Sequence, residues 1–124
     1  MPVKKILVVE DDSALLRALG DKLEHEKFTV LRASDGIQGL SVAMQEHPDL
    51  ILLDIVMPKM DGITMLSQLR DDEWGSDVPV MMLTNLNDAD KVQKALENKV
   101  FDFLVKADWK LEDLVEKVKT KLGV

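Results

Sequence analysis

The sequence predicts an α/β fold in which one parallel sheet is covered by helices on both faces. Short apolar runs alternate with longer amphipathic stretches along the chain, which is the pattern of repeated βαβ units. The run at residues 50–53 contains four apolar residues with no polar alternation, which is typical of a strand buried on both faces. These two observations favour a parallel sheet that is buried on both faces and in which strands and helices alternate along the chain.

The individual elements follow from the same two periodicities. Continuous apolar runs predict the strands, and apolar residues spaced three or four apart predict the helices, as with Leu15, Leu19 and Leu23 early in the chain and Leu111 and Leu114 late in it. The predicted strands are residues 4–9, 29–33, 49–54, 79–84 and 101–105. The predicted helices are residues 13–26, 36–47, 62–72, 88–98 and 110–122.

Capping and turn residues mark the ends of the predicted helices. Pro48 ends the second helix, because the residue before a proline avoids the α-helical region. The histidines, His25 and His47, fall at predicted helix ends, where they interact with the helix dipole, so we assign neither a metal or catalytic role. The other signals are Ser13 as N-cap of the first helix, Asp12 as a second candidate cap, Asp61-Gly62 before the third helix, Asn87 or Asp88 before the fourth, and Gly123 after the last.

Composition restricts the classes of protein that fit this chain. With 124 residues, of which 46% are hydrophobic, we expect a single domain over residues 1–124 with its own core. The absence of cysteine excludes disulfides and cysteine zinc sites, and agrees with a cytoplasmic location. No apolar run approaches the roughly 18 residues of a membrane span, and the start is too short for a signal peptide. A net charge of −7 argues against direct binding of nucleic acid or an anionic membrane by this domain.

Polar side chains come directly at the ends of four predicted strands. Glu10 and Asp11 follow the first strand, Asp54 ends the third, Thr84 ends the fourth and Lys106 follows the fifth. Because parallel strands end at the same edge of a sheet, and open α/β sheets bind their ligands there, these side chains should converge. Carboxylates, a hydroxyl and an ammonium together suit a divalent cation and a phosphoryl group. Asp54, at the end of a buried strand, is then the candidate nucleophile for an aspartyl phosphate.

This set of residues resembles the receiver domain of two-component response regulators, of the type represented by the chemotaxis response regulator. Besides the polar residues at the strand ends, the resemblance includes the motif Met-Pro-x-Met-Asp-Gly at residues 57–62 and covers the whole chain. It implies a doubly wound, flavodoxin-like (βα)5 three-layer sandwich with strand order 2-1-3-4-5. It also implies Mg²⁺-dependent phosphoryl transfer from a sensor histidine kinase or a phosphotransfer protein, with Mn²⁺ as a substitute metal. Such a domain assists its own phosphorylation and dephosphorylation and is not a turnover enzyme.

The resemblance implies a role for each residue of the acidic set. Asp54 is the phosphoacceptor. Mg²⁺ is held by Glu10, Asp11 and Asp54, with the backbone carbonyl of Val56 as a further ligand.

Three further residues are implied to act during and after phosphorylation. Lys106 pairs with the acceptor carboxylate at rest and with a phosphoryl oxygen afterwards, and Thr84 donates its hydroxyl to another phosphoryl oxygen. Phe103 is the aromatic switch residue, which turns inward when Thr84 moves toward the phosphoryl group. The surface expected to change then contacts a second copy of the chain or a target protein, and it is formed by residues 88–98, 101–105 and 110–122.

One departure from the family pattern concerns the peptide bond after Lys106. The family usually has a proline there, joined by a cis bond, whereas this chain has Ala107. Because a cis bond before a non-proline residue costs about 2.5–4 kcal/mol, we predict a trans bond with the Lys106 amine still reaching Asp54.

Three other functions are compatible with parts of the pattern. A flavodoxin-like cofactor module would need a Ser/Thr/Gly loop after the first strand, where this chain has acids. A phosphohydrolase with an aspartate nucleophile normally has a second acid two residues later, where this chain has Val56. A receiver-like adaptor would keep the fold without being phosphorylated, and Ala107 is compatible with it. The sequence leaves open the cognate kinase, the output and whether the domain stands alone.

Overall fold

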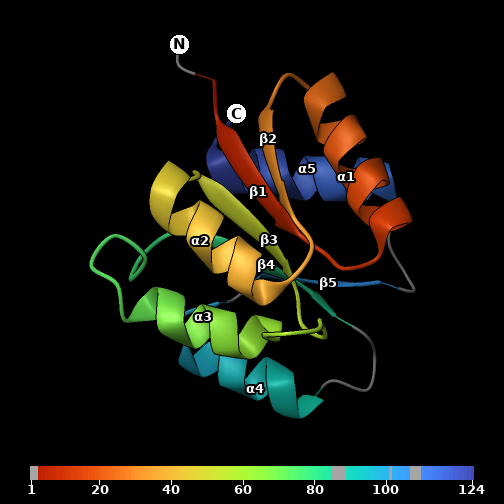
Figure 1. Ribbon diagram of the computed structural model, residues 1–124. Helices are drawn as coiled ribbons and strands as arrows, with labels where there is room; N and C mark the ends of the chain where they lie inside the picture. Colours follow the sequence, from red (N-terminus) through yellow and green to blue (C-terminus); the bar gives the residue numbers. More distant parts are fainter. Residues whose placement is uncertain (1–2, 85–88, 101, 107–109) are drawn as a thin grey trace.

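The computed structural model describes residues 3–84, 89–100, 102–106 and 110–124. Within these residues the chain forms five strands that alternate with five helices (Figure 1). The strands are β1 (Lys5–Val9), β2 (Thr29–Ala33), β3 (Leu50–Asp54), β4 (Val80–Thr84) and β5 (Asp102–Val105). The helices are α1 (Ser13–His25), α2 (Gly36–Glu46), α3 (Gly62–Arg70), α4 (Ala89–Glu97) and α5 (Leu111–Leu122).

The strands form one parallel sheet in the order β2-β1-β3-β4-β5, so the predicted fold class and strand order are confirmed. All five residues of β3 are buried, as its unbroken apolar run predicts. The predicted elements are all present, with boundaries that differ by at most two residues where the chain is described. The predicted starts at Asp88 and Phe101 lie outside the described residues.

Two apolar clusters hold the helices against opposite faces of the sheet. Alternate residues of one strand enter different clusters, so that Leu7 and Val9 face one side and Ile6 and Val8 the other. The first cluster takes residues from α2, α3 and α4, and the second takes residues from α1 and α5. The result is the three-layer arrangement visible in Figure 1.

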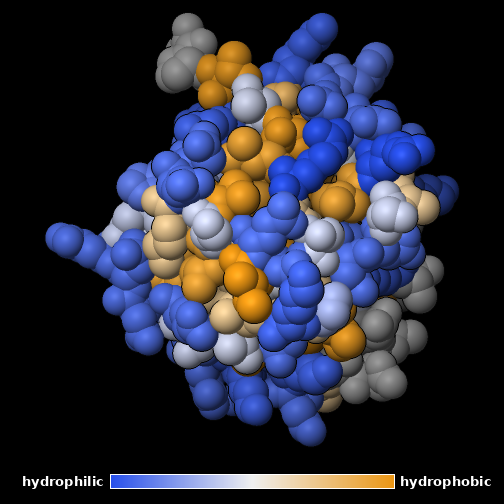
Figure 2. Space-filling model, viewed as in Figure 1, coloured by the Kyte–Doolittle hydropathy of each residue, from blue (hydrophilic) through white to orange (hydrophobic). Residues whose placement is uncertain are grey.

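The outer surface is mostly polar, but it is not uniform. Figure 2 shows apolar side chains between α1 and α2, over the part of the sheet formed by β1 and β2. β2 is an edge strand, and its residues Val30 and Leu31 are only partly buried. No helix in the described part of the chain is long and apolar enough to cross a membrane.

Aspartates cap the first three helices, and one predicted cap is wrong. Asp12, not Ser13, is the N-cap of α1, because its carboxylate accepts hydrogen bonds from the backbone N–H groups of Ala14 at 3.0 Å and Leu15 at 3.1 Å. Ser13 is instead the first residue of the helix. Asp61 caps α3 as expected from its turn chemistry, and Asp35 caps α2, which the sequence did not predict.

Helices α2 and α5 each end at a residue in the left-handed conformation. α2 ends before Pro48 as predicted, but His47 takes the left-handed conformation (φ 48°) instead of an extended one. Its ring stacks on Trp74 with centroids 4.3 Å apart, so Trp74 packs against the end of α2. Gly123 ends α5 with φ 73°, as predicted. The candidate caps Asn87 and Asp88 lie outside the described residues.

Both ends of the described chain lie at the edge of the sheet where the strands begin (Figure 1). Val3 and Val124 are exposed, and they line the same shallow cavity of about 440 Å³. Lys4, Phe28 and Lys119 also line this cavity.

Candidate functional site

The parallel strands bring the predicted polar residues to one edge of the sheet. Glu10 follows β1, Asp54 and Thr84 are the last residues of β3 and β4, and Lys106 follows β5 directly. Register keeps these ends level, since Asp54 lies opposite Leu83 on β4. The convergence expected from the sequence is therefore present.

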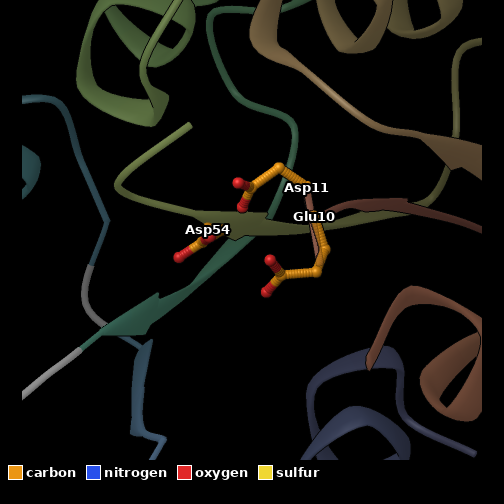
Figure 3. Close-up of side chains that lie close together, drawn as sticks. All are labelled: Glu10, Asp11 and Asp54. Atoms are coloured by element: carbon orange, nitrogen blue, oxygen red, sulfur yellow. The ribbon is translucent and has the colours of Figure 1, made fainter. Parts of the chain in front are cut away.

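Three carboxylates form the centre of the site. Glu10, Asp11 and Asp54 each offer an oxygen, and these oxygens lie within 4.8 Å of one another. Figure 3 shows the three side chains around a shared space, two from the end of β1 and one from the end of β3. Glu10 is fully buried and Asp54 is 4% exposed, whereas Asp11 is open to solvent. The space is thus bounded by buried acids on one side and accessible from the other.

Lys106 is the cation of the site. Its Nζ lies 3.0 Å from Oδ1 of Asp54, which is the contact the sequence predicted, and 2.9 Å from Oε1 of Glu10, which it did not. Burial by itself lowers the pKa of Lys106, but the hydrogen-bonding and charge interactions with the two carboxylates outweigh it and raise the pKa. Lys106 therefore stays an ammonium and neutralises part of the acidic charge.

The site disfavours the charged form of Glu10. Burial, helped by the nearby charge of Asp54, raises its pKa to about 7, against the opposing effects of the Asp12 N–H and of Lys106. Its Oε2 accepts a hydrogen bond from the backbone N–H of Asp12 at 3.0 Å. Its buried Oε1 forms the ion pair with Lys106 and has no other partner among the described residues.

This donor set fits a divalent cation such as Mg²⁺. Mg²⁺ prefers oxygen ligands and binds through one or two carboxylates while keeping several waters, and an open acidic space allows both. Oε1 of Glu10 has no partner other than Lys106 among the described residues, so it keeps a lone pair for a further ligand.

The β3–α3 loop, residues 55–61, forms one wall of the site. The N–H of Gly62 donates to the carbonyl of Ile55 at 2.7 Å, and a Cβ on Gly62 would lie 2.1 Å from the carbonyl oxygen of Asp54. Only glycine allows this close approach between the start of α3 and the end of β3. Val56 is 52% exposed in this loop, between the buried residues Ile55 and Met57.

Of the remaining predicted residues, Thr84 and Phe103 belong to the strands beside the acidic cluster, whereas the histidines lie where strands begin, at the opposite edge of the sheet. Thr84 is buried at the end of β4, and Phe103 is partly buried, with its side chain packed against the cluster beneath α2, α3 and α4. His25 and His47 lie at helix ends, as predicted. Ala107, and with it the predicted trans bond, lies outside the described residues.

Fold and site together define a class of protein: a doubly wound parallel sheet with an acidic cluster and a lysine at its carboxyl edge. The sequence model of the response regulator receiver domain matches residues 6–119. The chain therefore belongs to the response regulator receiver family of two-component systems.

Individual relatives agree with this assignment. The chain is 39% identical over 119 residues to the DNA-binding dual master transcriptional regulator RpaA of Synechocystis sp., covering 95% of this chain and 48% of that protein. It is 43% identical over 103 residues to the response regulator PleD of Caulobacter vibrioides, covering 82% and 22%. The chain thus spans about half the length, or less, of these curated relatives.

Solved structures agree as well. The response regulator receiver domain protein (CheY-like) of Methanospirillum hungatei has a TM-score of 0.90 at 29% identity, over 98% of this chain and 95% of that one. The chemotaxis response regulator CheY4 of Vibrio cholerae has a TM-score of 0.88 at 25% identity, over 96% and 98%.

Proposed function

We propose that Asp54 is the residue that accepts the phosphoryl group, from a phosphohistidine of a cognate sensor histidine kinase or phosphotransfer protein. The observation that carries this proposal is the position of its carboxylate, nearly buried, 3.0 Å from an ammonium and grouped with two further acids. Asp11 is exposed, and burial raises the pKa of Glu10 to about 7, so Asp54 is the best nucleophile of the three.

Each residue of the site has a separate role in the proposed phosphoryl transfer. An oxygen of Asp54 attacks the phosphorus, an acyl phosphate bond forms, and the bond to the imidazole nitrogen of the donor breaks. Lys106, already beside Oδ1 of Asp54, neutralises charge on a phosphoryl oxygen, and the hydroxyl of Thr84 donates to another. The bond that forms is an anhydride, so water can later hydrolyse it and return the carboxylate.

We assign the metal ligands to Glu10, Asp11 and Asp54, with the backbone carbonyl of Val56 completing the protein's contribution. A bound Mg²⁺, for which Mn²⁺ can substitute, would offset the negative charge that the phosphoryl oxygens bring to the pocket. The cluster of carboxylate oxygens within 4.8 Å of one another supports this ligand set.

The proposed consequence of phosphorylation is a change of interaction surface. Thr84 moves toward the phosphoryl group, Phe103 turns inward, and the surface of α4, β5 and α5 then contacts a second copy or a target protein. We propose that phosphorylation takes place in the cytoplasm. We also propose that residues 1–124 form a single domain.

The identity of the acceptor is tested by intact-mass measurement after incubation with acetyl phosphate and Mg²⁺. The unmodified sequence should gain one phosphoryl group, and Asp54→Asn should gain none, because the amide keeps the shape and loses the nucleophilic charge. Asp12→Asn is the matched control, since it removes one acid beside the pocket while asparagine still caps α1. Labelling of Asp54→Asn would overturn the assignment, and an unmodified sequence that gains no phosphoryl group would instead favour the non-phosphorylated adaptor.

The metal assignment predicts a stability gain from Mg²⁺ that depends on Asp11. Binding to the folded state alone should raise the free energy of unfolding by about 2.7 kcal/mol at a Mg²⁺ concentration one hundred times the Kd. Thermal melting with Mg²⁺ and with a chelator measures this gain. Asp11→Ala, at an exposed position, should fold but lose most of it. An equal gain in Asp11→Ala would show that the cation binds elsewhere.

A further inference from the structure

The N-terminus of α2 holds the β3–α3 loop from outside the acidic site. The N–H of Gly36 donates to the carbonyl of Met60 at 3.1 Å. Beside this bond, Oδ2 of Asp35 lies 3.7 Å from Nζ of Lys59, and Asp35 is only 8% exposed. We call these four residues the α2 clasp.

Gly36 makes this contact possible because it has no side chain. A Cβ at this position would lie 2.2 Å from the carbonyl oxygen of Met60 and 2.8 Å from its carbonyl carbon. Both are backbone atoms, so they cannot turn aside as a flexible side chain would. A larger residue must therefore displace either the helix start or the loop.

The bond also uses a donor that the helix cannot use itself. Gly36 is the first residue of α2, and the first N–H groups of a helix have no partner within it. Asp35 caps the helix by accepting from the N–H of Gln38 at 2.8 Å, which leaves the N–H of Gly36 for Met60. The hydrogen bond between the N–H of Gly36 and the carbonyl of Met60 therefore joins the start of the helix to the loop.

A displacement at Met60 would reach the acidic site through the loop. The N–H of Met60 donates to the carbonyl of Pro58 at 2.7 Å, and the N–H of Gly62 donates to that of Ile55 at 2.7 Å. With Ile55 and Met57 buried, the loop has little freedom to absorb a shift locally. The first residue of the loop, Ile55, follows Asp54 directly in the chain.

We propose that Gly36 is a positioning residue for the acidic site, and that the α2 clasp sets how tightly the site binds Mg²⁺. Gly36 contacts neither the cation nor the phosphoryl group; it acts by holding the loop that carries Val56. The inference rests on the proposed function, because it assumes that the acids and this loop form the cation site. It extends the site to a helix that contributes none of its acids.

The decisive comparison is between Gly36→Ala and Gly39→Ala in the same helix. A Cβ on Gly39 would lie 2.9 Å from both Cγ atoms of Val9 and 3.0 Å from Sδ of Met65, which are core side chains and not part of the loop. Calorimetric titration with Mg²⁺ should give a Kd about tenfold weaker for Gly36→Ala, the lower end of the effect of losing a group that supports metal ligands. Gly39→Ala should keep the Kd of the unmodified sequence, whatever its stability. Equal Kd changes in the two variants, or none in Gly36→Ala, would overturn the inference.

A second pair of variants decides the matter if Gly36→Ala does not fold. Lys59 has φ 67° and Lys27 has φ 77°, so both positions accept glycine without backbone strain. Lys59→Gly removes the ion pair of the clasp, whereas Lys27→Gly removes the same charge from the turn between α1 and β2. Losing a positive charge by itself favours cation binding, so weaker Mg²⁺ binding in Lys59→Gly alone would support the clasp. Unchanged or tighter binding there would contradict it.

The same titrations separate this inference from the proposed function. If the unmodified sequence binds Mg²⁺ and Asp54→Asn does not, the site is correct and the glycine comparison tests only the clasp. If the unmodified sequence does not bind Mg²⁺, the proposed function fails first.

Discussion

Replacing Arg70 by alanine should lower the free energy of unfolding by about 3 kcal/mol, since hydrogen bonds to charged groups contribute roughly 1.5–3 kcal/mol each and do not add fully. The guanidinium at the end of α3 donates to the carbonyl of Asn98 through Nε and to those of Gly75 and Val78 through Nη1, each at 2.8 Å. One side chain thereby ties α3 to the loop before β4 and to the turn after α4. Without it, three partly buried carbonyls lose their partner.

Arg32→Ala is the matched control for this prediction. Arg32 also makes two charged contacts, at 3.2 Å to Asp21 and 2.9 Å to Glu24, but both acids are more than half exposed. Exposed ion pairs contribute about 1 kcal/mol or less, so this variant should lose far less stability. Urea unfolding of both variants measures the difference. Similar losses would mean that water easily replaces Arg70 at the three carbonyls, and that these hydrogen bonds add little stability.

In the presence of a chelator, Glu10 should make the fold less stable as the pH rises from about 5 to 8. Its pKa is 4.5 in an ordinary setting and about 7 in the fold, so between these values the folded state holds a proton that the unfolded state has lost. This contribution is complete below about pH 4.5 and is lost as the pH rises through about 7. Integrated over the window, it amounts to about 3 kcal/mol.

The comparison with Glu10→Gln isolates this effect from all other titrating groups. The amide cannot titrate, so Glu10→Gln should gain stability relative to the unmodified sequence as the pH rises, measured by urea unfolding at each pH. Glu26→Gln is the control: hydrogen bonding to Lys119 lowers the pKa of Glu26, so its contribution changes only below this window. A constant difference between Glu10→Gln and the unmodified sequence from pH 5 to 8 would contradict the prediction.

The fold could be predicted from the sequence because each element carries its own pattern. The apolar run of β3 and the stripes of α1 and α5 are local, and the strand-end polar residues converge by topology alone. The contact between Lys106 and Asp54 followed from the family resemblance, since the strands at whose ends these residues lie, β5 and β3, are separated by β4.

What could not be predicted depends on contacts between distant segments. The pairing of Lys106 with Glu10 arises because burial leaves Glu10 with few other partners. The cap of α1 was misassigned by one residue because Asp12 and Ser13 are both good caps, and only the extended backbone of Asp12 decides between them. Gly36 looked like an ordinary helix residue, since nothing in its neighbourhood along the chain indicates that Met60 packs against it.

The positions of Val3 and Val124 have a consequence for any longer protein that contains this domain. Sequence added at either end would join the domain at one edge of the sheet, leaving the carboxyl edge open to an approaching kinase. Strands of five residues separate the two edges by roughly 17 Å, given about 3.3 Å per residue. A joined segment would therefore begin about one strand length away from the acidic cluster.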